Sequence, residues 1–361
     1  MKPLIIGDLE VKLPLIQGGM GVGVSLSSLA GAVAFEGGVG VISTAQIGFY
    51  RPDFNKNPLE ANLKAIEEQV KRAKEIGRGG VIGANIMVAG RNYKEYVTAA
   101  VKAGGDLIIS GAGLPTELPA YVKDAKVKLA PIVSSEKAAK LLCRMWDKRH
   151  HCTPDLVIVE GPMAGGHLGF SKEQLKPFSE KNDEEIRRMM ADYDGEIEKI
   201  IQVCETYGEK YNKNIPVVVA GGIDSHEKVQ HCLNLGASGI QVATPFVATE
   251  ECDAHPNFKK AYVEATSEDV VILNSPVGMP GRGIRNTFLK NIEEGHRGKI
   301  HCRQCLEHCD PATIPYCITD ALIRSVQGDV ENGLVFCGAE VDKIKKISTV
   351  HEVIESLFIS E

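Results

Sequence analysis

The stretch IPVVVAGGIDSHEKVQHCLNLGASGIQVATPF, residues 215–246, contains two apolar runs, each followed by a loop, with a helix-like segment between them. Both runs are apolar throughout rather than alternating with polar residues, which is typical of strands buried on both faces of a parallel sheet. A strand, a helix and a second parallel strand form the unit from which α/β folds are built. This stretch therefore predicts an α/β protein.

Similar runs occur eight times along the chain. They are LPLIQGG (13–19), VGVISTA (39–45), VIGANIMV (81–88), LIISGAG (107–113), VKLAPIV (127–133), LVIVEG (156–161), IPVVVAGG (215–222) and GIQVATPF (239–246). Nearly every run precedes a helix-like segment, such as 57–77 or 92–104. Eight such units predict a closed (β/α)8 TIM barrel. The alternative is an open doubly wound nucleotide-binding sheet, which the glycines of QGGMGVG (17–23) would suit but which usually has fewer strands.

Two segments depart from the repeat. Residues 171–214 form a long charged insertion between strands six and seven, which we expect to be an extra helix pair over the barrel mouth. A cysteine-rich extension follows the eighth strand. The expected domains are a barrel over 1–250, with the insertion at 171–214, and a C-terminal extension over 251–361. That extension would hold a cysteine cluster at 302–317 and terminal helices packed on the barrel.

The amino-acid composition limits the kinds of partner that the protein could bind. The 361 residues are 43% hydrophobic and carry a net charge of -6 with no run of like charge, which argues against a nucleic-acid or membrane surface and favours a small-molecule substrate. The beginning, MKPLIIGDLEVKLPLIQ, lacks the features of a secretory signal, and no stretch has the roughly 18 apolar residues needed to span a bilayer. We expect a cytoplasmic protein, for which a homodimer is possible.

Glycine-bearing loops follow the last two strands, where barrels often bind phosphate. Gly221 and Gly222 would let backbone N–H groups approach a phosphate closely, and Thr244 could add a hydroxyl donor. The alternative interpretation of each loop is a tight turn that binds no ligand. Together, after neighbouring strands, they predict a phosphorylated ligand.

Several motifs then carry a more specific resemblance. In order, they are QGGMGVG (17–23), GANIM (83–87), GAG (111–113), EGPMAGGHLG (160–169), AGGI (220–223), GIQVATPF (239–246), AHPNFK (254–259) and SPVGMPGRGIRN (275–286). The chain resembles the superfamily of nitronate monooxygenases and enoyl-acyl-carrier-protein reductases II across the whole barrel. The resemblance implies an FMN cofactor.

The same resemblance implies which residues bind that FMN. Its phosphate would lie on Gly222, Ala243 and Thr244, and its ring over Gly18, Gly19 and Met20, with Asn85 and Gln241 nearby. Glu160, Gly166 and Gly221 complete the expected cofactor site. These eleven residues and His167, discussed next, are called the twelve predicted cavity residues below.

His167 is the expected catalytic residue. An imidazole can exchange a proton near neutral pH, and a flavin enzyme needs such a group beside its substrate. A lone histidine is more often structural, but the matching AGGH motif favours the catalytic interpretation. Met163 departs from the family, whose members often have an acidic residue there, so that Glu160 would be left as the carboxylate of this segment.

Four cysteines lie close together in HCRQCLEHCDPATIPYC: Cys302, Cys305, Cys309 and Cys317, here called the cysteine quartet. Such a density of thiols predicts a metal site of zinc or iron–sulfur type. The spacing is similar to that in flavin and iron–sulfur enzymes of the 2,4-dienoyl-CoA reductase type, which favours a [4Fe–4S] cluster over zinc or free thiols. His301 and His308 could substitute as ligands.

The leading function is an FMN-dependent oxidoreductase of the nitronate monooxygenase type that oxidises alkyl nitronates or a related small substrate. One alternative is an NAD(P)H-dependent FMN reductase of enoyl thioesters or quinones. Another is a phosphate-binding barrel without flavin. Arg282 and Arg285 could hold a phosphate or thioester group of the substrate, or could lie in a solvated loop.

Overall fold

The computed structural model describes residues 1–123, 125–297 and 300–359. Its centre is a closed parallel barrel with the strand order β10-β11-β3-β4-β5-β6-β7-β8. The strands are β3 (Leu15–Gln17), β4 (Val39–Ser43), β5 (Val81–Met87), β6 (Leu107–Gly111), β7 (Lys128–Val133), β8 (Val157–Glu160), β10 (Val217–Ala220) and β11 (Gly239–Val242). Each lies within one of the eight predicted runs, so the prediction of a TIM barrel is confirmed.

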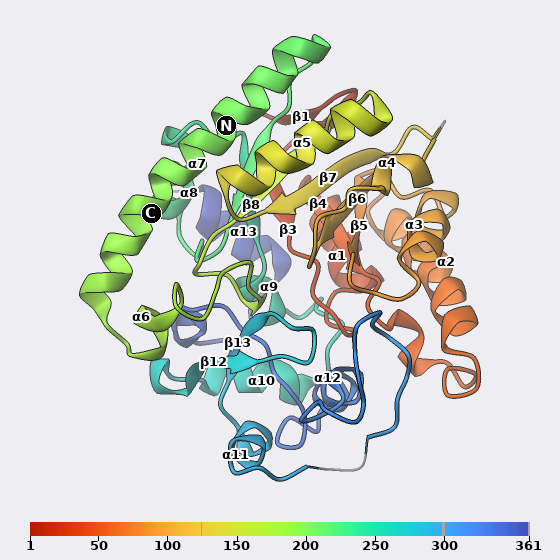
Figure 1. Ribbon diagram of the computed structural model, residues 1–361, viewed down its shortest axis with the longest axis vertical. Coiled ribbons are helices and arrows are strands. Elements are labelled where there is room, and N and C mark those ends of the chain that lie inside the picture. Colours follow the sequence, from red (N-terminus) through yellow and green to blue (C-terminus); the bar gives the residue numbers. More distant parts are fainter. Residues whose placement is uncertain (124, 298–299, 360–361) are drawn as a thin grey trace.

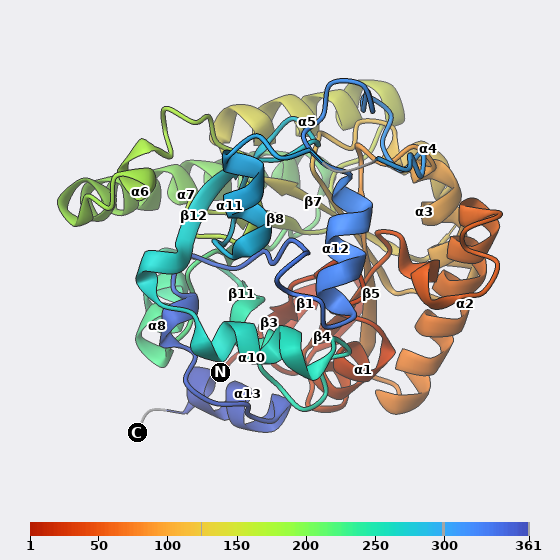
Figure 2. The same cartoon turned by 90° about the horizontal axis from the view of Figure 1, so that it is seen from below.

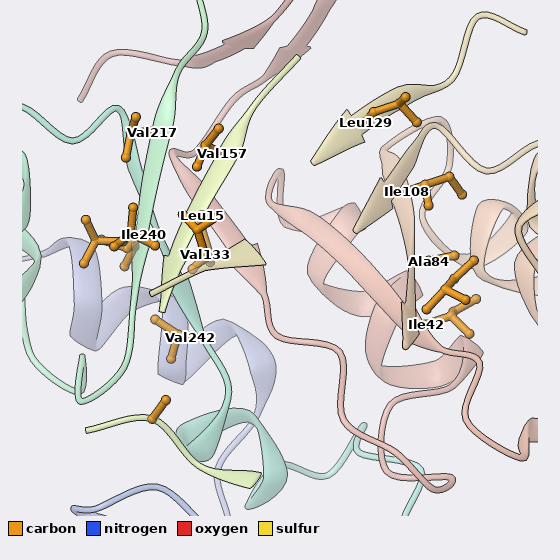
Figure 3. Close-up of a cluster of buried hydrophobic side chains, with 14 of the residues drawn as sticks. Leu15, Ile42, Ala84, Ile108, Leu129, Val133, Val157, Val217, Ile240 and Val242 are labelled. Atoms are coloured by element: carbon orange, nitrogen blue, oxygen red, sulfur yellow. The ribbon is translucent and has the colours of Figure 1, made fainter. Parts of the chain in front are cut away.

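The strands are apolar throughout because both of their faces are buried. On β8, Ile158 belongs to the cluster inside the barrel, whereas Val157 and Val159 belong to the layer between strands and helices. The same alternation holds on β6, where Ile108 belongs to the outer layer. Figure 3 shows Ile108, Val157 and further side chains of this outer layer on strands around the ring. This alternation decides which residues face the barrel axis at the mouth.

Helices that follow the strands surround the barrel and cover this layer of apolar side chains. They are α1 (Ser27–Phe35), α2 (Pro58–Ile76), α3 (Tyr93–Lys102), α4 (Leu118–Tyr121), α5 (Glu136–His150), α7 (Asp183–Tyr211) and α8 (His226–Asn234). In Figure 1, α2 and α3 lie on one side of the strands and α7 on the other. Helix α2 illustrates the local signals: the Asn57 side chain accepts the N–H of Glu60, and Pro58 occupies the first turn.

The end of the barrel at which the strands begin, opposite the mouth, is closed by a short hairpin of β1 (Leu4–Ile6) and β2 (Leu9–Val11). Leu4, Ile6 and Val11 are almost fully buried and belong to the same cluster as the interior strand residues. The barrel interior is thus a packed core that leaves room for a ligand at the other end.

The expected helix pair over the barrel mouth is wrong. The segment between β8 and β10 contains β9 (Gly166–His167), the one-turn helix α6 (Lys176–Ser179) and the 29-residue helix α7. Ile197, Ile200 and Cys204 are buried on α7, which contacts α5, β8 and β10 as the sixth barrel helix. The charged first turns of α7 extend beyond the barrel, and α6 lies at the outer left edge of Figure 2.

The chain leaves the barrel after β11 and returns before its last helix. After α9 (Thr244–Val247), Thr249 forms a β-bridge with Ser348, so residues 249 and 348 lie side by side. Helix α13 (Val350–Phe358) then packs against α1, α8 and α9. The chain between 249 and 348, called the excursion below, is therefore inserted before the eighth barrel helix, whereas the sequence had suggested a tail. The domain boundary at residue 250 stays an interpretation.

The excursion carries its own small elements over the barrel mouth. They are α10 (Pro256–Glu264), β12 (Val270–Asn274), β13 (Pro280–Ile284), α11 (Thr287–Glu293) and α12 (Ile318–Val326). β13 pairs with both β12 and β9, so the excursion is joined by a ladder to the loop that follows β8. None of the helices in the described ranges is both long and apolar enough to cross a membrane.

Candidate active site

A cavity of about 260 Å³ opens where the barrel strands end. All twelve predicted cavity residues line it: Gly18, Gly19, Met20, Asn85, Glu160, Gly166, His167, Gly221, Gly222, Gln241, Ala243 and Thr244. The structure thus brings together residues from most strands of the barrel. Their individual roles stay predictions.

Strand alternation directs three polar side chains inward at the mouth. Glu160 follows Ile158 by two residues on β8, and Ile158 faces the barrel axis. Gln241 lies between Ile240 and Val242, which both belong to the outer layer, and Asn85 is flanked in the same way on β5. Because successive side chains of a strand point to opposite faces, all three point toward the axis.

Gly18 and Gly19 form the part of the cavity lining called its floor here, and both lie directly against other residues of the barrel mouth. A Cβ on Gly19 would come within 2.3 Å of the Asn85 Cβ, and one on Gly18 within 2.9 Å of the Ala243 Cβ. Any side chain at these positions would have to displace these neighbours. A floor of bare backbone suits a planar ring.

The loop after β10 also requires glycine, for two reasons. Gly221 and Gly222 have φ values of +103° and +74°, which side chains rarely adopt. A Cβ on Gly222 would also lie 2.6 Å from the Cβ of Met163. The apolar Met163 therefore fills the space beside this loop, and its carbonyl accepts the N–H of Ala339 at 3.1 Å.

The hydroxyl of Thr244 is held from the excursion. The backbone N–H of Gly338 donates to Thr244 Oγ1 at 3.1 Å, so the hydroxyl hydrogen is left for another acceptor. Nearby, Lys228 donates to the Gly222 carbonyl at 2.8 Å and forms ion pairs with Asp224 and Glu340. Lys343 pairs with the same two carboxylates, so two cations offset two anions beside the loops that would hold a phosphate.

The side-chain oxygen of Gln241 tests whether a flavin fits the cavity. The residue is 9% exposed, and its Oε1 atom has no hydrogen-bond partner within the described part of the chain. A buried acceptor without a partner costs about 1–3 kcal/mol, which a ligand N–H donor would recover. An isoalloxazine ring has such a donor, so the orphaned oxygen, the floor of bare backbone and the glycine loops all fit FMN.

His167 is positioned by the excursion. It lies on β9, paired with Gly281 of β13, and its Nε2 atom lies 2.7 Å from Ser275 Oγ. The ring of Phe336 packs edge-on against it with centroids 5.0 Å apart. Burial lowers the pKa of His167 to about 4, so the imidazole is neutral at physiological pH and can accept a proton.

The pKa of Glu160 is shifted in the opposite direction. Burial alone raises the pKa of its carboxyl to about 7, because no cation or hydrogen-bond donor stabilises the charged form. Below that pH the protonated carboxyl can donate a hydrogen bond into the cavity. A neutral imidazole and a partly protonated acid therefore line the same cavity.

The interpretation of Arg282 as a group that holds substrate or lies in a solvated loop is wrong. Arg282 is 1% exposed, donates to the carbonyls of Pro162 (2.8 Å) and Ala164, and lies 4.5 Å from the Phe178 ring centroid. Burial lowers the pKa of its guanidinium to about 10. Arg282 thus holds the loop before His167, whereas Arg285 is paired at the surface with Glu293 at 2.7 Å.

Sequence reasoning did not single out the site residues contributed by the excursion. Ser275 stood within a motif but had no signal of its own, and nothing distinguished Phe336 or Gly338. Their place depends on the return of the chain to the barrel, which no local pattern encodes. The signal that could have found Ser275 is its position as the first residue of the motif SPVGMPGRGIRN (275–286).

The cysteine quartet lines a second, smaller hollow, outside the cavity. Cys302 is exposed and the other three thiols are partly buried. Across residues 1–123, 125–297 and 300–359, no three His, Cys, Asp or Glu side chains converge as ligands of one metal ion. His301 and His308 are absent from the lining of this hollow. The metal site therefore stays a prediction.

Known proteins resemble the chain over nearly its whole length. A family model described as nitronate monooxygenase matches residues 2–360. A probable nitronate monooxygenase of Staphylococcus saprophyticus is 26% identical over 314 residues, which cover 80% of each chain. The structure of FabK from Thermotoga maritima has a TM-score of 0.67 and 25% identity, and covers 96% of this chain and 92% of its own.

A nitroalkane oxidase from Streptomyces ansochromogenes has a TM-score of 0.69, with 96% of this chain and 94% of that chain covered. Its identity is 18%, so this likeness supports the fold alone. The comparisons thus agree with the barrel and with a family assignment.

Proposed function

Because this chain belongs to the nitronate monooxygenase family, we propose that it binds FMN in the cavity at the barrel mouth and oxidises alkyl nitronates or a related small substrate. The chain is a flavin-dependent oxidoreductase, as members of that family are. One observation carries the proposal: a single cavity contains the glycine loops, the orphaned acceptor of Gln241 and the neutral imidazole of His167.

The residues that would hold FMN divide by the part of the cofactor they meet. The loop at Gly221 and Gly222 and the hydroxyl of Thr244 would bind the phosphate through hydrogen-bond donors. The backbone of Gly18 and Gly19 would support the ring, and Gln241 would accept from a ring N–H. When bound, FMN supplies the two-electron chemistry that no side chain can perform.

The chain's own residues then bind the substrate and handle its proton. His167, neutral above about pH 4, can accept the α-proton of a neutral nitroalkane and so form the nitronate in the cavity, and Ser275 Oγ fixes the orientation of its ring. Protonated Glu160 donates a hydrogen bond to an oxygen of a nitro or nitronate group. Ile132, Leu322 and Phe336 give the cavity an apolar wall that suits an alkyl substituent and excludes water.

A second function, an NAD(P)H-dependent reductase of enoyl thioesters or quinones, is favoured by a different observation. Within the described residues, no Lys or Arg side chain lines the cavity. An anionic nitronate must therefore rely on hydrogen bonds alone, whereas a neutral thioester or quinone needs no cation.

Turnover distinguishes these two functions. Purified protein is given propyl-2-nitronate in the presence of oxygen, and separately NADH or NADPH with an enoyl thioester or a quinone. Oxygen uptake with the nitronate supports the leading proposal, and nicotinamide oxidation that depends on the acceptor supports the alternative. Turnover of none of these substrates would contradict both.

The second cofactor that we propose is a metal centre on the cysteine quartet, with a [4Fe–4S] cluster before zinc. All four thiols line one hollow, which supports the proposal. Loss of colour and of metal from a quartet variant, with FMN retained, is the expected result. A homodimer also remains a proposal.

A further inference from the structure

Arg282 on β13 is a buried cation without a carboxylate partner. Its side chain is 1% exposed, and no Asp or Glu of the described ranges forms an ion pair with it or affects its pKa. Its Nη2 atom has no hydrogen-bond partner there either. Since the pKa of the guanidinium is about 10, the side chain is charged at physiological pH. A buried charge without a partner is costly, so a negatively charged ligand close by would offset it.

The guanidinium holds two carbonyl groups of the loop that follows β8. Its Nη1 atom donates to the carbonyl of Pro162 at 2.8 Å and to that of Ala164. In a trans peptide the C=O and the N–H point in opposite directions, so the N–H groups of Met163 and Gly165 point away from Arg282. Within residues 1–123, 125–297 and 300–359, neither N–H has an acceptor. Arg282 thus orients two free backbone donors.

These two donors lie on the cavity side of the loop. Met163 and Gly165 line the cavity, whereas Arg282 does not, and neither does Phe178, whose ring lies against the guanidinium. The loop therefore lies between the cation and the cavity. Backbone N–H groups that point the same way form a site for anions. A positive potential can thus reach the cavity although the cation itself lies behind its wall.

The same loop lies against the glycine loop after β10, where we expect the phosphate of FMN. A Cβ on Gly222 would be 2.6 Å from the Cβ of Met163. One on Gly221 would be 3.0 Å from the backbone nitrogen of Ala164. The N–H groups that Arg282 orients therefore belong to the end of the cavity at which the phosphate would bind.

The other charged side chains beside the glycine loop cancel one another. Lys228 pairs with Asp224 and Glu340, and Lys343 pairs with the same two carboxylates. Two positive and two negative charges leave no net charge to balance a ligand. A phosphate monoester carries a charge of about −1.5 to −2 at pH 7. Among the described residues, Arg282 is the only Lys or Arg that is almost fully buried, and its charge is the one left over.

We propose that Arg282 provides the counter-charge for the phosphate of FMN, through the two peptide groups that it holds and without touching the phosphate. The inference rests on the proposed function for its ligand. Arg282 is then a positioning residue, which fixes the N–H groups of Met163 and Gly165. Its charge acts over a distance because the surroundings have a low dielectric constant. The cavity should therefore prefer the phosphorylated flavin to riboflavin.

The test compares FMN with riboflavin, which has the same ring and lacks the phosphate. The full chain, freed of bound flavin, is titrated with each compound, and binding is followed by flavin fluorescence. Wild type should bind FMN at least about tenfold more tightly than riboflavin. Arg282→Met, which removes the charge and keeps an unbranched side chain, should raise the Kd of FMN by about tenfold or more. It should raise the Kd of riboflavin by less than about threefold.

Two further variants separate this role from a general loss of structure. Arg285→Met, at the surface arginine paired with Glu293, is the matched control and should change neither Kd. Arg282→Lys keeps the charge, so its preference for FMN should lie between those of wild type and Arg282→Met. It also carries the comparison if Arg282→Met does not fold, which thermal unfolding would reveal.

The outcomes distinguish this inference from the proposed function. Wild type that binds both flavins equally well, or Arg282 variants that lose both flavins to the same extent or keep the wild-type preference, would overturn the inference and leave the flavin site standing. Wild type that binds neither flavin would contradict the proposed function, and the inference with it.

Discussion

At the scale of single residues, His167 and Glu160 show how one environment sets two opposite ionisation states. Both side chains lie in the cavity, and burial disfavours the charged form of each. The imidazole becomes a base that is available at neutral pH, and the carboxyl becomes an acid that keeps its proton up to about pH 7. The cavity that both line is therefore suited to proton exchange with a bound substrate.

We expect His167→Ala to keep FMN and to lower turnover of a neutral nitroalkane by about two to four orders of magnitude, because the group that accepts its α-proton is removed. Steady-state turnover and flavin absorbance measure the two effects separately. Ser275→Ala, which removes only the hydroxyl beside Nε2, should have a smaller effect on turnover. Full activity of His167→Ala would refute its assignment as the base.

The raised pKa of Glu160 predicts that substrate binding depends on pH. With its pKa raised to about 7, the carboxyl is a neutral donor below that pH and a negative charge above it. The KM for an anionic nitronate should therefore rise as the pH increases through about 7, and Glu160→Gln, neutral at every pH, should flatten the profile. A neutral enoyl thioester serves as the control substrate. An identical nitronate profile in both proteins would show that Glu160 does not meet the anion.

At the scale of elements, the loop after β10 connects backbone conformation to cofactor binding. We expect Gly222→Val to lose FMN, because a β-branched side chain is strained at φ +74° and its Cβ collides with Met163. Flavin content after purification and an FMN titration measure the loss.

The matched control is Gly195→Ala on α7, where an added Cβ meets no atom within 4 Å. That change should keep FMN and stabilise the protein by about 0.5–1 kcal/mol, because alanine is the better helix former. Normal FMN affinity in Gly222→Val would mean that the cofactor does not depend on this loop.

The elements also show what the sequence could predict. Buried parallel strands are apolar on both faces, so all eight strands and the loops at their ends could be read directly, as β8 and β10 illustrate. The segment 171–214 was misjudged because its charged first turns concealed that α7 is an ordinary barrel helix. Arg282 was misjudged because the partners that bury it, Pro162 and Phe178, lie more than 100 residues away.

At the scale of the whole molecule, the excursion both covers the candidate active site and contributes residues to it. It supplies Phe336 and Gly338 to the cavity and Ser275 to the imidazole of His167, and its ends meet where Thr249 pairs with Ser348. Sequence placed the excursion after the barrel, because helix α13 lies a hundred residues beyond the last strand and only tertiary packing identifies it as the eighth barrel helix.

This arrangement predicts that the C-terminal helix stabilises the barrel. Leu357 on α13 is 1% exposed, so Leu357→Ala should lower the free energy of unfolding by about 2–5 kcal/mol. Glu355→Ala, exposed on the same helix, should change it by less than about 0.5 kcal/mol. Thermal unfolding compares the two. Equal stability of both variants would mean that α13 does not close the barrel.

The most direct test of the flavin site is the absorbance near 450 nm, typical of oxidised flavin, before and after substrate is added without oxygen. Wild-type protein should contain one FMN per chain, and propyl-2-nitronate or NAD(P)H should bleach it rapidly. His167→Ala should contain the same FMN and bleach far more slowly with a neutral nitroalkane, whose α-proton His167 would accept. A colourless protein that takes up no added FMN would contradict the account.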